Sequence, residues 1–265
     1  MRLLSILSSL ALAAYLVWET ARSPAMYRRL KEAIQSGNTQ ARIGFYCSVY
    51  WFEGISALLA AAALRFDRQR LDPSRLELAS SSFGMWWHSA LVHLNKEILI
   101  GMGIGIGISV AAIVVALKLA NRRAARAPKP ALKQSKLFPD VSYLLPISGR
   151  ERALFALVAL AAGVCEEIVF RGWLLSVFHE SLNLNGWTMV LSASICFGLA
   201  HYYQGVAGIV VTSVLGLVFC GLYVGSGTLL VPIIAHVLVD LRWAVFPSMP
   251  GITPQQPGAT PAATS

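Results

Sequence analysis

The sequence predicts an all-α membrane protein, a bundle of about seven transmembrane helices with six and eight as alternatives. Two properties of the chain support this fold class. Of its 265 residues, 56% are hydrophobic and only 13% are charged, whereas roughly 25% of an average soluble domain is charged. The mean hydropathy is +0.61, and several apolar runs approach the about 20 residues that a spanning helix needs.

Two spans are expected near the N-terminus. The first run covers Leu3 to Trp18. Small residues near its end also suit a signal peptide, but only one arginine precedes the run and no polar domain follows it, which favours a spanning helix. The second run covers Ile43 to Leu64 and contains Glu53.

The next two apolar segments differ in kind. Phe83 to Leu94 carries two tryptophans and two histidines, a composition that suits an interfacial helix. Ile98 to Leu119 has glycine at alternate positions from Gly101 to Gly107. Small residues four apart let a neighbouring membrane helix approach, and the spacing does not match a dinucleotide-binding loop. Residues 1–120 are therefore predicted to be N-terminal transmembrane helices with one interfacial segment.

The densest group of Lys and Arg residues follows, and it predicts a basic linker over residues 121–150. The excess of positive charge places this linker in the cytoplasm. Two predicted spans separate it from Glu19 to Arg42, a second basic segment, so both can lie on one side. The basic loop from Arg65 to Arg75 would then face the opposite side, against the rule.

The second half of the chain is more tightly organised. Residues 151–246 are predicted to form the transmembrane core that holds the functional site, and residues 247–265 a disordered tail rich in Pro, Ala and Thr. The four core spans are Arg152 to Phe178, Gly186 to Tyr203, Val206 to Val224 and Leu229 to Phe246.

The net charge indicates which partners to expect, and the positions of the cysteines indicate which kinds of site to exclude. The net charge is +9, carried by loops between apolar runs. Anionic lipids at these basic loops are therefore the expected partners, and nucleic acid is not expected. Four cysteines lie inside apolar runs without a CxxC pair, so they are predicted to be small buried hydrophobic residues and not disulfides or a zinc site.

Three ionisable residues interrupt the first core span. Glu166, Glu167 and Arg171 lie within one apolar stretch, where each charge costs about 2.5 to 3.5 kcal/mol on insertion scales. Glu167 and Arg171 are four residues apart, share a helix face and can form an ion pair. Glu166 points about 100° away. An ion pair that only joins helices would account for Glu167 and Arg171 but leaves Glu166 unexplained.

Two later spans carry further acid–base groups. His201 follows Phe197 by four residues, and His236 and Asp240 are also four apart. Either histidine alone would more often be a hydrogen-bonded residue of the bundle. Because polar side chains of membrane bundles face inward, groups on three helices predict one shared site.

The chemistry of that site has two interpretations. A carboxylate and a histidine can deprotonate a water, while a second histidine stabilises an oxyanion, which together would hydrolyse an amide. Alternatively, Glu166, His201, His236 and Asp240 are candidate ligands for a divalent metal such as zinc. The chain has no HExxH motif, and no metal or other cofactor is predicted with certainty.

Taken together, the motifs resemble the CPBP family of intramembrane proteases (CAAX protease and bacteriocin processing, or Abi). The family pattern is EExxxR, then FxxxH, then HxxxN or HxxxD, and this chain carries all three in order between Arg152 and Phe246. The resemblance implies that Glu166 activates water with His201, while His236 and Asp240 stabilise the oxyanion. It implies supporting roles for Glu167, Arg171 and Phe197. The prenyl endopeptidases typically have Asn where this chain has Asp240, which weakens a specific CAAX assignment.

The resulting prediction is a multi-pass intramembrane endopeptidase of the bacterial inner membrane. Its substrates would be prenylated CAAX proteins or other membrane-associated peptides. Two other functions stay open at this point. One is a catalytically silent scaffold or bacteriocin-immunity protein, and the other is a proton-coupled transporter, although no inverted repeat is apparent.

Overall fold

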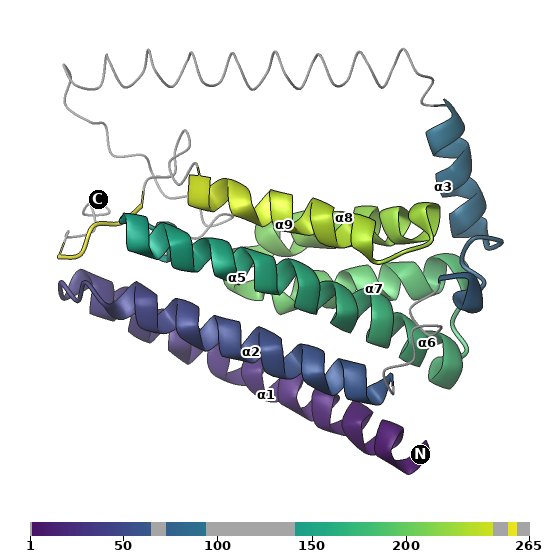
Figure 1. Ribbon diagram of the computed structural model, residues 1–265, viewed down its shortest axis with the longest axis horizontal. Helices are drawn as coiled ribbons and strands as arrows, with labels where there is room; N and C mark the ends of the chain where they lie inside the picture. The colour runs from purple at the N-terminus through teal and green to yellow at the C-terminus, as the bar shows by residue number, and fades with distance from the viewer. Residues whose placement is uncertain (1, 65–72, 94–140, 246–253, 259–265) are drawn as a thin grey trace.

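The computed structural model describes residues 2–64, 73–93, 141–245 and 254–258. These residues form helices and connecting turns, and no strand occurs among them. The helices α1 (Arg2–Gln35) and α2 (Ala41–Ala63) form an antiparallel hairpin that packs as a layer against the rest of the bundle (Figure 1). The prediction of an all-α bundle is confirmed.

The helix α1 is much longer than the predicted first span. It has 34 residues and continues through Pro24, so the basic segment from Glu19 is mostly helical and the prediction that the first helix stops at Trp18 is wrong. Its side chains pack into the bundle, since Leu12 and Ile34 are fully buried. The predicted interfacial helix is present as α3 (Ser82–His93), which follows the 3-10 turn η2 (Pro73–Leu76).

The longest apolar helix is made of three consecutive pieces. The helix α5 (Gly149–Glu167) continues as a π-helical stretch, η4 (Ile168–Leu174), and then as α6 (Leu175–Leu182). Its start is fixed by a capping box in which Ser148 and Glu151 each bond the other's backbone amide. This reciprocal bonding satisfies amides that the first turn would otherwise leave without partners.

Three more helices complete the core. They are α7 (Gly186–Ala200), α8 (Gly205–Ser226), which follows the 3-10 turn η5 (Tyr202–Gln204), and α9 (Leu230–Val245). The helix α5 lies between α2 and α9, while α7 and α8 pack together behind it (Figure 1). Glycines allow two of these approaches: Gly163 faces Val237 of α9, and Gly216 faces Ser194 of α7.

The described helices include three that are long and apolar enough to cross a membrane: Ala41–Ala63, Gly149–Leu182 and Tyr202–Ser226. A shorter apolar helix covers Gly186–Ala200. Large apolar side chains on their outer faces, such as Leu58, Leu157 and Val210, are more than half exposed, as expected where lipid replaces water. The predicted span Ile98 to Leu119, its glycines and most of the basic linker lie outside the described residues.

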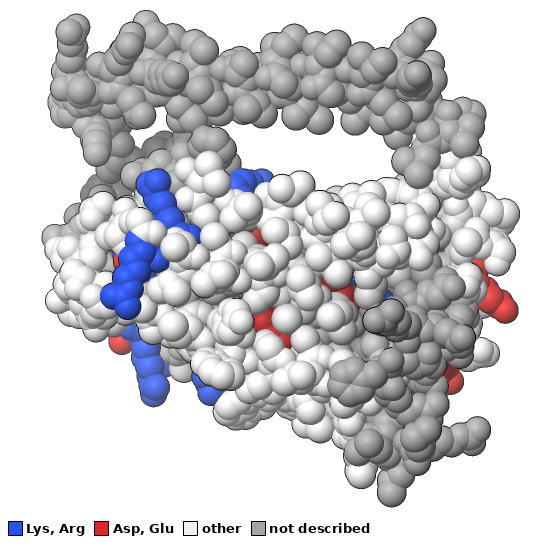
Figure 2. Space-filling model, viewed as in Figure 1, with Lys and Arg blue, Asp and Glu red and all other residues white. Residues whose placement is uncertain are grey.

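The ends of three helices meet at one end of the bundle. Arg42, at the start of α2, is 4.0 Å from Glu151 of α5 and donates to the carbonyls of Tyr143 and Gln255. Gly258 also donates to the carbonyl of Ile34, so residues 254–258 of the predicted tail contact the bundle. Figure 2 shows Lys and Arg side chains gathered at the end where α5 begins, with a mostly uncharged surface beyond. The domain boundaries predicted from the sequence stay predictions.

Candidate active site

The two adjacent glutamates lie where the main helix changes its winding. Glu166 and Glu167 are the last residues of α5, and Arg171 lies in the π-helical stretch that follows. Single-turn π-helices inside α-helices occur frequently at functional sites, because the wider turn redirects side chains. The sequence gives no sign of this change in winding, which explains why we expected a regular helix here.

Glu167 and Arg171 form the predicted ion pair at the centre of the bundle. Arg171 Nη1 donates to Glu167 Oε1 at 2.9 Å, and Nη2 donates to the carbonyl of Gly216 at 3.1 Å. Both side chains are buried, with 0% and 1% exposed. The guanidinium also lies 4.6 Å from the centre of the Phe197 ring. This arrangement fixes α5 against α7 and α8 and keeps Arg171 away from the space beside Glu166.

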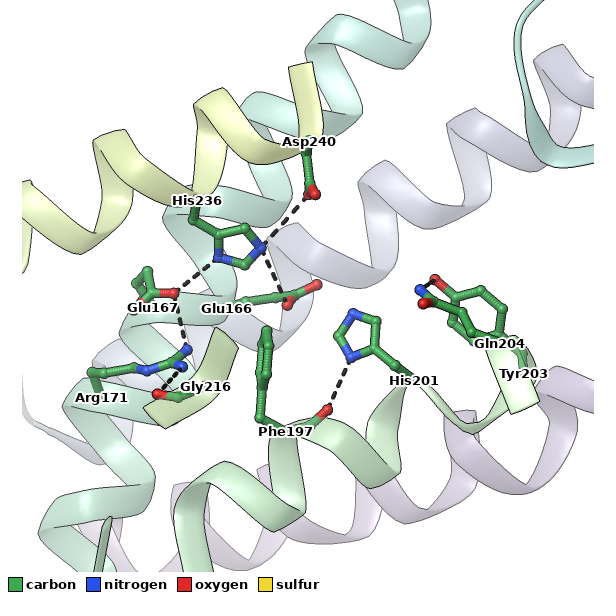
Figure 3. A network of polar contacts seen from close by, with 10 residues as sticks. All are labelled: Glu166, Glu167, Arg171, Phe197, His201, Tyr203, Gln204, Gly216, His236 and Asp240. Atoms are coloured by element: carbon green, nitrogen blue, oxygen red, sulfur yellow. Dashed lines mark hydrogen bonds and ion pairs between the residues drawn. The ribbon is translucent and has the colours of Figure 1, made fainter. Parts of the chain in front are cut away.

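His236 connects the glutamate pair to α9 (Figure 3). Its Nδ1 atom is 2.9 Å from Glu167 Oε1, and the opposite nitrogen, Nε2, lies 3.8 Å from Glu166 Oε2 and 3.6 Å from Asp240 Oδ2. Glu167 therefore has a second partner that helix geometry alone did not predict. Because Nδ1 is held by Glu167, Nε2 is the atom of His236 that is directed at the other two carboxylates.

Glu166 is the carboxylate that the described residues leave least satisfied. Its Oε2 atom is buried and has no hydrogen-bond partner there, although the side chain as a whole is 16% exposed. A buried oxygen of this kind costs free energy unless water or a ligand completes it. Helix geometry predicts that Glu166 points away from the ion pair of Glu167 and Arg171, and the side chains have this arrangement.

His201 approaches the same space from α7. It ends that helix as its C-cap, and Nδ1 lies 2.9 Å from the carbonyl of Phe197. This bond satisfies one of the carbonyls that the last turn of a helix leaves free. It also turns Nε2 toward Glu166 (Figure 3). The ring of Phe197 separates His201 from Arg171 and packs against both histidines, at 4.8 Å from His201 and 5.8 Å from His236.

Asp240 forms the more open side of the site. Its side chain is 35% exposed, compared with 5% for His236, and it interacts electrostatically with His201 as well as with His236 and Glu166. All seven predicted site residues thus lie in one connected cluster. Their individual roles stay predictions.

Two residues that the sequence did not assign to the site also reach it. Glu53 of α2 is buried and interacts electrostatically with Glu166 and Asp240. Tyr203 follows His201 in the turn after α7 and interacts with the same two carboxylates. A lone carboxylate inside the second apolar run was the available signal for Glu53. Nothing in the sequence singled out Tyr203 from the other tyrosines.

The candidate ligand set for a metal does not converge in the described part of the chain. Glu166, His201, His236 and Asp240 have the donor chemistry that zinc prefers. However, no group of three His, Cys, Asp or Glu side chains among the described residues is arranged to hold an ion. His236 Nδ1 is already bonded to Glu167, and His201 Nδ1 to a carbonyl.

The part of the chain that carries these motifs is similar to a known protein family. Residues 149–242 match the family model described as Type II CAAX prenyl endopeptidase Rce1-like. The matched segment begins with α5 and contains every motif residue from Glu166 to Asp240, while α1, α2 and Glu53 lie outside it. No curated protein and no solved structure gives a significant match to the chain. This similarity is limited to residues 149–242, and it agrees with the resemblance to the CPBP family that the motifs indicate.

Proposed function

We propose that this protein is an intramembrane endopeptidase in which Glu166, assisted by His201, activates a water for attack on a peptide bond. The observation that carries this proposal is the buried Glu166 Oε2 atom, which has no hydrogen-bond partner among the described residues and lies between two histidines. A general base needs an unshared oxygen within reach of the water that it deprotonates. The family match supports endopeptidase activity in general.

The proposed steps use only side chains of the cluster. Glu166 takes a proton from the water as the water oxygen bonds to the carbonyl carbon, and the carbonyl oxygen becomes negatively charged. His201 Nε2 orients the water, since Nδ1 is occupied by Phe197. His236 carries a proton on both ring nitrogens in this step, so that Nδ1 donates to Glu167 and Nε2, which lies beside Asp240, donates to the developing oxyanion. The C–N bond then breaks, and Glu166 returns its proton to the leaving amine.

The helix lengths support a site below the membrane surface. The helix α7 has 15 residues, which at 1.5 Å per residue rise about 22 Å, less than the roughly 30 Å of a hydrocarbon core. At least one end of α7 therefore falls short of an interface, and we place the turn that carries His201 at that end. Non-helical backbone at that depth is tolerated where it is buried in protein or lines a water-filled cavity. The exposed part of Asp240 marks the side from which water and substrate would enter.

Prenylated CAAX proteins are the substrate class that we propose, with other membrane-associated peptides as the alternative. A prenyl chain would rest among the apolar side chains that face lipid and keep the peptide end near the bilayer. We further propose that the basic end of the bundle faces the cytoplasm of a bacterial inner membrane. Arg28 and Arg29 of α1 lie toward that end, as do Arg150 and Arg152 of α5, in line with the positive-inside rule and with contacts to anionic lipids.

The direct test is cleavage of a synthetic peptide by the purified protein in liposomes. A farnesylated peptide that ends in a CAAX sequence is expected to lose its last three residues, as read by mass spectrometry. The same peptide without the farnesyl group separates the two substrate classes: equal cleavage would remove the prenyl requirement but keep the endopeptidase. A folded protein that cleaves neither peptide, nor any membrane-associated peptide in a library, would favour a silent scaffold.

A further inference from the structure

The turn that follows His201 is bound to the N-terminal helix α1, which lies outside the matched residues 149–242. Tyr202 is the first residue of this turn, η5. Its hydroxyl oxygen lies 2.7 Å from Ser23 Oγ and 3.1 Å from the carbonyl oxygen of Thr20, both on α1. The contact joins residues that are 179 positions apart in the sequence, so it depends on how α1 packs against the turn and not on local helix geometry.

The carbonyl of Thr20 is available for this contact because of Pro24. In an α-helix this carbonyl would accept a hydrogen bond from the amide four residues later, but proline has no amide hydrogen. The helix α1 nevertheless continues through Pro24. The hydroxyl groups of Tyr202 and Ser23 both reach the Thr20 carbonyl, at 3.1 Å and 3.2 Å. The turn after His201 thus supplies a donor to a carbonyl that the proline leaves without its helical partner.

A second contact fixes the same turn through aromatic rings. Tyr203 stacks on Tyr27 of α1, with ring centres 4.3 Å apart and an angle of 18° between the planes. Tyr203 also accepts a hydrogen bond from Gln204 at 3.0 Å, and its ring centre lies 6.0 Å from that of His201 (Figure 3). Stacked aromatic pairs stabilise beyond the burial of their area. Two consecutive residues therefore hold the turn to α1, one by hydrogen bonds and the other by stacking.

We propose that Tyr202 is a positioning residue for the proposed hydrolysis, because its bond to α1 holds the turn in which His201 Nε2 is directed at Glu166. The consequence for cleavage rests on the proposed function, while the contact itself is a property of the folded protein. The bond from His201 Nδ1 to the Phe197 carbonyl fixes the ring relative to α7, but the backbone of His201 has left the helix, with φ −97° and ψ 20°. Helix ends fray unless tertiary contacts hold them, and α1 supplies such contacts here.

The activity test compares substitutions that keep or remove one hydroxyl group in the full-length protein. Tyr202→Phe keeps the ring, and kcat is expected to fall by about threefold to tenfold, as for loss of one hydrogen bond between neutral groups. KM should change little, because the hydroxyl group is directed at α1. Ser23→Ala should lower kcat in the same way, whereas Ser23→Thr keeps a hydroxyl group and should stay within about twofold of the wild type. Tyr50→Phe, at a half-exposed tyrosine of α2, is the control and should leave kcat unchanged.

Hydrogen exchange followed by mass spectrometry supplies a measurement that does not require activity. The amide of His201 donates to the carbonyl of Gly198, and that of Gln204 donates to the carbonyl of His201. In Tyr202→Phe the amides of residues 201–205 are expected to exchange about threefold to tenfold faster, because the turn opens more easily. Segments within α5 and α9 should exchange as in the wild type, which checks that the variant is folded. Tyr50→Phe should leave exchange of the turn unchanged.

Each measurement can reject the proposal. Unchanged exchange of the turn in Tyr202→Phe would mean that the hydroxyl group does not hold it. Faster exchange with an unchanged kcat would mean that the position of the turn does not limit cleavage. An equal fall of kcat in Ser23→Thr and Ser23→Ala would also contradict the role of the hydroxyl group. A wild type that cleaves no peptide, with exchange that responds to Tyr202→Phe, would reject the proposed function and with it the role in hydrolysis, and would keep the contact.

Discussion

The buried ion pair of Arg171 gives a prediction whose size follows from the structure. Replacing Arg171 with Met would leave Glu167 as a fully buried carboxylate with His236 as its remaining partner, and would remove the donor to the carbonyl of Gly216. Breaking a buried pair by removing one partner costs about 3–5 kcal/mol. The lost contacts with the Phe197 and Phe219 rings act in the same direction.

The exposed pair Arg22 and Glu19 is a matched control within the same chain. Arg22 also has an acidic partner on its own helix, at 3.5 Å, and also lies over an aromatic ring, but its side chain is 45% exposed. An exposed pair contributes about 0–1 kcal/mol. Both arginines have an acidic partner and an aromatic contact, but only Arg171 is buried and also donates to a backbone carbonyl, so the comparison measures what the buried network adds to an ordinary surface pair.

The assay is thermal unfolding of the purified variants in detergent, followed by tryptophan fluorescence. Arg171→Met is expected to lower the unfolding temperature by about 6–20 °C, taking 2–4 °C per kcal/mol for a domain of this size, and Arg22→Met by less than about 4 °C. The double variant Glu167→Gln with Arg171→Met should recover part of the loss, since no unpaired charge remains. Equal shifts for Arg171→Met and Arg22→Met would refute the view that the pair fixes the core.

Three other predictions concern packing, water orientation and metal dependence. At Gly163 even a Cβ atom would lie 2.5 Å from Val237 Cγ2, so the side chain of Gly163→Leu should push α5 away from α9 at a cost of about 1–3 kcal/mol. This separation should also lower cleavage, because it moves Glu166 away from His236. An unchanged unfolding temperature would contradict this prediction. His201→Asn keeps a donor for the Phe197 carbonyl but removes Nε2, so cleavage should fall about a hundredfold while the unfolding temperature stays the same; a protein of full activity would remove His201 from the mechanism. Treatment with a strong chelator, followed by elemental analysis, should leave activity intact, and stoichiometric zinc whose removal abolishes cleavage would show that a metal is required.

The sequence predicted much of the site because its residues obey helix periodicity. The four-residue spacing of Glu167 and Arg171 gave the ion pair, and the angle between adjacent residues separated Glu166 from it. Periodicity acts within one helix, however, and carries no information on which helices are neighbours. The bond from His236 to Glu167 and the electrostatic interaction of Glu53 with Glu166 depend on packing between helices, so they were not predictable from spacing.

The boundaries of the helices were predicted less well, for physical reasons. Hydropathy locates apolar runs, but α1 continues for 17 residues beyond Trp18, from residue 19 to Gln35. This part of the helix is polar and packs against its neighbour, so it needs no apolar face toward lipid. The π-helical stretch at Ile168–Leu174 has no composition that distinguishes it from an α-helix. His201 was placed within a span, whereas it ends α7, and that position frees its Nε2 atom.

The central claim is that Glu166 activates the water, and single-turnover cleavage of a farnesylated peptide in liposomes tests it most directly. Glu166→Gln keeps the size of the side chain but removes the base, and Glu32→Gln on the exposed face of α1 is the control. The account predicts a loss of about 10²- to 10⁴-fold in the cleavage rate for Glu166→Gln, with an unchanged unfolding temperature, and no loss for Glu32→Gln. A Glu166→Gln protein that cleaves as fast as the wild type would contradict the account.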